Sequence, residues 1–117
     1  ALAAYQAGEA IEHLFADDYK SVVETHAFFA RVSIILFGAL AASYSVACIN
    51  TIKTVSLPLW STATRAQKFI LNAPVATTVA ALGLIAISIT GALGASIAHG
   101  PDSDPFVSFV YRIFIGQ

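Results

Sequence analysis

Two histidines are the residues of this sequence best suited to chemistry. His26 begins one long apolar stretch, and His99 ends another. If the two stretches cross a bilayer in opposite directions, both imidazoles lie near the same membrane face. Two imidazoles suit a b-type haem, because histidine is a common axial ligand of haem iron, and they also suit a pH-sensitive pair. The alternative, which we favour, is that each ring reaches interfacial water with its polar tip.

A third candidate is Arg31, which lies inside the first apolar stretch. A charge in lipid is costly, so the position predicts contact with an acidic lipid headgroup, a small molecule or a partner subunit. The alternative, again favoured, is that the side chain extends to the interface or pairs with Glu24. Aromatic residues at predicted membrane boundaries are expected to contact lipid or partners; these are Trp60, Phe106, Phe109 and Phe114.

Several classes of protein are excluded or disfavoured. A single cysteine, Cys48, allows no internal disulfide, no C-x-x-C-H haem attachment and no thiolate zinc cluster. The net charge of -1, without a basic run, argues against a nucleic-acid partner. The sequence contains no recognisable catalytic triad, carboxylate pair or phosphate loop. We therefore expect no metal site and no enzymatic activity.

The composition points to a membrane. Hydrophobic residues make up 57% of the 117 residues and charged residues 11%, with a mean hydropathy of +0.76. An ordinary soluble domain has about 25% charged residues. A domain this short has too much surface for its volume to hide so much apolar area. Lipid, or other membrane subunits, must therefore cover it.

The elements that carry these residues form an all-α fold, an integral membrane two-helix transmembrane hairpin with flanking amphipathic helices. The central stretches each exceed the roughly 20 residues that a spanning helix needs. A capping box of Ser21 and Glu24 predicts that the first helix starts at Ser21. The predicted segments are an acidic amphipathic arm (1–20), a first transmembrane helix (21–50), a loop (51–72), a second transmembrane helix (73–99) and an interfacial aromatic helix (104–117).

Charge and small residues predict orientation and packing. The loop carries Lys53, Arg65 and Lys68 and no acidic residue. The excess of Lys and Arg places it in the cytoplasm, and both termini in the periplasm, of a bacterial inner membrane. The absence of methionine predicts a processed product. Small residues of the two helices are expected to face each other in a close seam: Gly38, Ala42 and Ser45 against Gly83, Gly91, Gly94, Ala95 and Ala98.

The end of the second stretch reads TGALGASIAHG, with Thr90, Gly91, Leu93, Gly94, His99 and Gly100 at the positions of interest. This resembles the closing segment of a family of small four-helix bacterial membrane proteins of unknown function. Glu24, Thr25 and His26 resemble the start of that family's third helix. The chain is thus similar to the second half of such a protein, although it has two predicted spans and a shorter stretch before His99. The resemblance implies a respiratory or redox-adjacent setting.

These observations together predict a small non-catalytic membrane subunit. It would pack onto a larger respiratory or photosynthetic complex, or onto copies of itself, and stabilise the assembly. One alternative is an electron-transfer protein with haem b on His26 and His99. Another is a binder of lipids or small molecules that uses Arg31.

Overall fold

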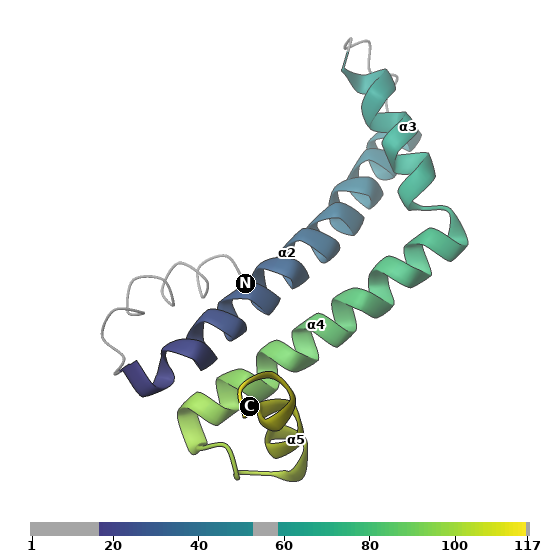
Figure 1. Ribbon diagram of the computed structural model, residues 1–117. Helices are drawn as coiled ribbons and strands as arrows, with labels where there is room; N and C mark the ends of the chain where they lie inside the picture. Colours follow the sequence, from purple (N-terminus) through teal and green to yellow (C-terminus); the bar gives the residue numbers. More distant parts are fainter. Residues whose placement is uncertain (1–16, 53–58, 117) are drawn as a thin grey trace. The chain divides into compact units, whose positions relative to one another are not determined.

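The computed structural model describes residues 17–52 and 59–116, and 89% of these residues are helical. The described ranges contain four helices and no strand (Figure 1): α2 (Asp17–Ile52), α3 (Trp60–Ile70), α4 (Ala73–His99) and α5 (Pro105–Phe114). The prediction of an all-α protein is therefore confirmed for this part of the chain. Most of the predicted acidic arm, residues 1–16, lies outside the described residues, as do residues 53–58, with Lys53, and Gln117.

Both α2 and α4 are long and apolar enough to cross a membrane. The 27 residues of α4 begin and end where the sequence predicts, and they span about 40 Å at the usual rise per residue. Gly100 ends α4 with a φ of 91°, a left-handed conformation that glycine adopts without strain. Its N–H donates to the Ser96 carbonyl at 3.0 Å. The predicted stop at Gly100 therefore has a clear conformational basis.

The start of α2 differs from the prediction. The helix begins at Asp17, four residues before the expected start at Ser21. Ser21 lies inside the helix, where its carbonyl accepts the Thr25 hydroxyl at 2.8 Å. Residues 17–20 are thus already helical, and Ser21 and Glu24 do not mark the start of this helix.

The chain divides into two compact units, and the described part of the first comprises residues 17–34 and 84–116. Its buried core joins three helices: Val22 of α2, Ala92 and Leu93 of α4, and Val107 and Val110 of α5. Leu93 is fully buried and Val22 nearly so. The start of α2, the end of α4 and α5 are therefore held together by one small apolar cluster.

The second unit comprises Ile35–Gly83, which contains the end of α2, all of α3 and the start of α4. The Phe37 ring of α2 packs on Gly83 of α4. The loop predicted between the two long helices contains α3, which follows the end of α2 (Figure 1). No residue of α3 is buried, and polar contacts of Trp60 and Thr64 with Asn50 link this helix to α2.

Candidate functional site

The His26 side chain is held against α4. Its Nδ1 lies 2.9 Å from the Thr90 carbonyl oxygen. A carbonyl can only accept, so Nδ1 carries the hydrogen and donates it. A Cβ atom added at Gly94 would lie 3.1 Å from Cε1 of the same ring. The absence of a side chain at Gly94 thus lets the imidazole rest on one turn of α4, with its orientation fixed by a backbone acceptor.

This contact determines what His26 can do chemically. A neutral imidazole that donates from Nδ1 has a lone pair on Nε2. A backbone carbonyl on the other ring nitrogen is the usual means of orienting a metal-binding histidine. The same contact brings the ring against the α4 backbone, which leaves no room for a macrocycle between His26 and Gly94.

His99 is placed differently. It is the last residue of α4 and is exposed. It lies nine residues beyond Thr90, which is about 13 Å along the helix axis. His26 therefore contacts a different turn of α4 from the one that carries His99. The described residues also contain no group of three or more His, Cys, Asp or Glu side chains suited to a metal ion.

Arg31 is exposed on α2, five residues after His26, and its side chain interacts with another part of the chain. Cys48 is also exposed and is a free thiol.

The α5 helix presents two faces with different roles. Asp104 caps its start, since Oδ1 accepts from the backbone N–H of Phe106 at 2.8 Å and of Val107 at 3.0 Å. This agrees with the predicted start at Asp104 and Pro105. The inner face carries Val107 and Val110 into the core. Phe114, predicted to contact lipid or a partner, packs edge-on against Phe29 with the ring centroids 5.1 Å apart.

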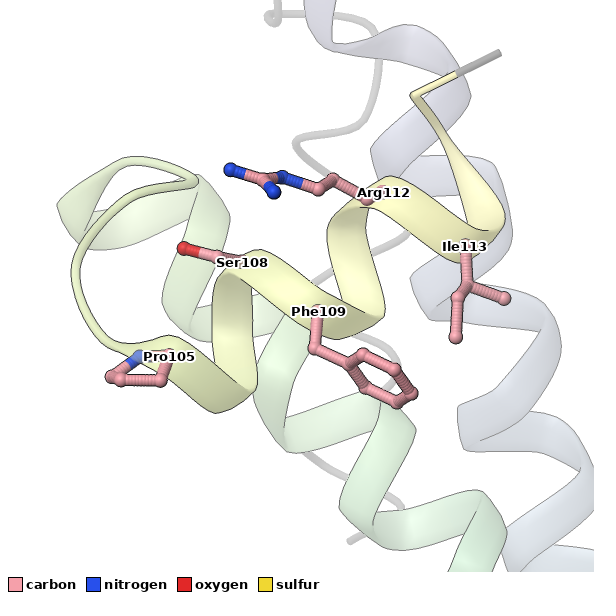
Figure 2. A pocket seen from close by; sticks show the side chains of 5 residues that line it. All are labelled: Pro105, Ser108, Phe109, Arg112 and Ile113. Carbon is pink, nitrogen blue, oxygen red and sulfur yellow. The ribbon is translucent and has the colours of Figure 1, made fainter.

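The outer face of α5 carries an open hollow lined by Pro105, Ser108, Phe109, Arg112 and Ile113. Figure 2 shows Phe109 and Ile113 projecting from one side of the helix, and Arg112 with Ser108 from another. Phe109 is 61% exposed and Phe106 51%. These two predicted contact residues are therefore available to lipid or to a partner, whereas Ser108 is engaged with the Pro101 carbonyl at 3.0 Å.

Trp60, the remaining predicted contact residue, is half-buried at the start of α3. Its Nε1–H donates to Oδ1 of Asn50, near the end of α2, at 2.7 Å. Nδ2 of Asn50 lies 3.4 Å from the Thr64 hydroxyl of α3. These two bonds fasten α3 to α2. The polar group of the indole is thus used within the chain.

Many serine and threonine hydroxyls of the long helices are satisfied locally. Eight of them each bond to a backbone carbonyl three or four residues earlier in the same helix, which removes the need for water. Residues with this bond are Ser33, Ser43, Ser45, Thr77, Thr78, Ser88, Thr90 and Ser96. Such local bonds are typical of serine and threonine in an apolar helix. No buried side-chain nitrogen or oxygen of the described residues is left without a partner.

The small-residue seam forms only in part. Gly83 and Gly94 face α2, but they receive aromatic rings rather than small residues. Gly38 and Gly91 have open space where a side chain would be, and Ala42, Ser45 and Ala98 are exposed. Sequence reasoning therefore missed Phe37 as a packing residue. The sequence held one signal of this packing, an equal spacing on the two helices. His26 and Phe37 are eleven positions apart, and so are Gly83 and Gly94.

Comparison with protein family models, curated proteins and solved structures finds no match to this chain. The resemblance to four-helix bacterial membrane proteins stays a prediction.

Proposed function

We propose that this chain is a bacterial inner-membrane protein whose two long helices cross the bilayer as a hairpin. In this proposal it is a non-catalytic subunit that packs onto a larger membrane assembly, or onto copies of itself, and stabilises it. The observation that carries the proposal is how little of the apolar surface is covered within the chain. In the most apolar stretch of α2, 11% of the residues are buried, and in that of α4, 28%. A core helix of a water-soluble protein would be mostly buried.

The hairpin is supported by the register of two contacts. His26 rests on Gly94, and Phe37 rests on Gly83. The equal eleven-residue steps on the two helices fit antiparallel neighbours with the same rise per residue. Each contact places a ring of α2 over a glycine of α4, so backbones approach closely at those points. Close approach is how membrane helices associate when lipid removes the hydrophobic drive between them.

The polar groups of the spans also support a lipid environment. Backbone and side-chain donors have no water to bond in a hydrocarbon core and must be satisfied internally. The local hydroxyl bonds described above meet that requirement even on exposed faces, for example at Ser45 and Thr77. The charges of the loop favour a cytoplasmic α3, with both termini in the periplasm.

The packing role is supported by the outward face of α2. Small residues repeat there at helical spacing, and all of them are exposed: Gly38, Ala41, Ala42 and Ser45. Nothing lies within 4 Å of the position of a Cβ at Gly38. The small side chains of such a face make little contact with lipid, but they let the backbone of another helix approach closely. Together with the aromatic outer face of α5, it offers two surfaces to neighbouring subunits.

The test is the mass of the protein extracted from membranes in a mild detergent. We expect a particle larger than a single chain of 12.3 kDa. Gly38→Leu should break the assembly, because a bulky side chain keeps a partner helix away, whereas Gly38→Ala should preserve it. A strictly monomeric wild-type chain, or an assembly that Gly38→Leu leaves intact, rejects the packing role on this face.

A second candidate function is haem binding, which one observation favours. The Nδ1–H of His26 is anchored on the Thr90 carbonyl, so Nε2 is the ring nitrogen that would bind iron. The position of His99, about 13 Å along α4 from that anchor, makes a haem shared with a second chain more reasonable than one held within the hairpin. Freshly isolated protein without a Soret band, or with a band unchanged in His26→Ala, rejects this candidate. The lipid-binding role predicted for Arg31 is the third candidate, and its test is retention of lipid by native mass spectrometry.

A further inference from the structure

The charges of this chain are sharply segregated. The sequence contains no acidic residue between Glu24 and Asp102. The whole second unit, Ile35–Gly83, therefore carries the positive charges of Lys53, Arg65 and Lys68 and no negative charge. Arg65 and Lys68 are exposed on α3 and have no ion-pair partner among the described residues. Neutralisation of these two cations must come from outside the unit.

The α3 helix sorts its residues by face. The half-buried residues recur at helical spacing and define an inner side: Trp60, Ala63, Thr64, Gln67 and Ile70. Arg65 and Lys68 lie on the exposed side. Residues three apart in a helix are neighbours on its surface, so these two cations lie side by side. Phe69 is 69% exposed beside them, and Leu59 just before the helix is 81% exposed. The exposed side thus combines two cations with large apolar side chains.

The ends of α3 restrict where this surface can be. Only Leu71 and Asn72 separate α3 from α4, and a two-residue link reaches at most about 7 Å. At the other end, Trp60 is bonded to Asn50 in the last turn of α2. If α2 and α4 cross a bilayer, α3 is held at the level of the lipid headgroups.

We propose that α3 binds lipids with anionic phosphate headgroups, through Arg65 and Lys68, while Phe69 and Leu59 insert at the acyl boundary. This inference rests on the proposed membrane location of α2 and α4. A lipid is the occupant that fits both halves of the surface, since cations beside exposed apolar residues are typical of helices that lie in the interface. Lysine and arginine also reach headgroups with their charged ends while their stems lie along apolar surface.

Trp60 provides a local probe, because it is the only tryptophan of the chain and lies on α3. The full chain would be reconstituted into phosphatidylcholine vesicles that contain brominated phosphatidylglycerol or, separately, brominated phosphatidylcholine. Bromine quenches the indole at short range, so the two quenching curves give the relative binding of the two lipids at α3. We expect stronger quenching by the anionic lipid. Each cation near a surface changes binding roughly fivefold, and the effect weakens at high salt.

The variant Arg65→Gln with Lys68→Gln should make the two quenching curves coincide. The matched control is Lys20→Gln with Arg112→Gln, which removes two exposed cations from the other unit and should keep the preference. Equal quenching by both lipids in the wild type, or equal losses in the two double variants, overturns the inference while leaving the membrane location intact. Absence of quenching by either lipid, with no flotation of protein with vesicles, overturns the membrane location itself.

Discussion

The imidazole of His26 rests directly on Gly94. A Cβ at that glycine would lie 3.1 Å from Cε1 of the ring, and Nδ1 reaches the Thr90 carbonyl one turn earlier at 2.9 Å. One turn of α4 thus supplies both the space for the ring and the acceptor that orients it. The glycine and the hydrogen bond form a single packing unit between α2 and α4.

The first prediction is that Gly94→Ala destabilises the protein although alanine favours helix. The new methyl group must push the ring by a few tenths of an ångström, and the bond to the Thr90 carbonyl opposes that shift. Overpacking of this kind costs about 1–3 kcal/mol. Reversible unfolding in mixed micelles, followed by circular dichroism, measures the change in the free energy of unfolding.

The matched control for Gly94 is Gly91→Ala. An added Cβ at Gly91 meets nothing within 4 Å, so alanine gains its helix propensity of up to about 1 kcal/mol without a clash. The two substitutions should therefore change stability in opposite directions. Equal effects at the two glycines would contradict the contact between His26 and Gly94.

The second prediction concerns Gly83, where a Cβ would lie 2.9 Å from Cζ of Phe37. This atom is the far end of a ring that is 37% exposed, so the ring can tilt outward. We expect Gly83→Ala to cost less than Gly94→Ala, at roughly 1 kcal/mol. Combining it with Phe37→Leu should recover part of the loss. A double-mutant cycle in the same unfolding assay gives the coupling, and strictly additive effects would argue against this contact.

The sequence predicts the long helices well because their signals are local. Long apolar runs, the first interrupted only by Arg31, identify α2 and α4, and α4 begins and ends as expected. Asp104 before Pro105 is a cap that acts on its own neighbours, so the start of α5 is also correct. The predicted start of α2 at Ser21 is wrong, because a Ser and a Glu three residues apart suit a helix interior as well as a cap.

The facing of side chains is harder to predict, since it depends on partners distant in the sequence. Small residues are present on several sides of both helices, so their presence alone does not say which ones face inward. Gly83 and Gly94 face inward because rings of α2 reach them, whereas Gly38 and Gly91 face open space. For the same reason the sequence identified His26 but not its acceptor, which is a backbone carbonyl 64 positions away.

The third prediction is that Asn50→Ala loosens α3. Removal of the amide takes away the acceptor of the Trp60 Nε1–H and the bond to Thr64. The surroundings are exposed, so water replaces part of the loss, and we expect a cost of about 0.5–1.5 kcal/mol. Amide hydrogen exchange across α3 should become faster. The control is Thr51→Ala, whose hydroxyl bonds within its own helix to Cys48; similar acceleration in both variants would mean that Asn50 does not fasten α3.

The fourth prediction separates the two roles that Asp104 has at the start of α5, as a hydrogen-bond acceptor and as a negative charge near the helix N-terminus. Asp104→Ala removes both and should cost about 1 kcal/mol. Asp104→Asn keeps an acceptor oxygen and caps as well as aspartate does, so it should retain most of the stability. Hydrogen exchange of the Phe106 and Val107 amides, which bond to Asp104 Oδ1, reports the cap directly. Faster exchange in both variants would mean that the charge, rather than the acceptor, stabilises this end of α5.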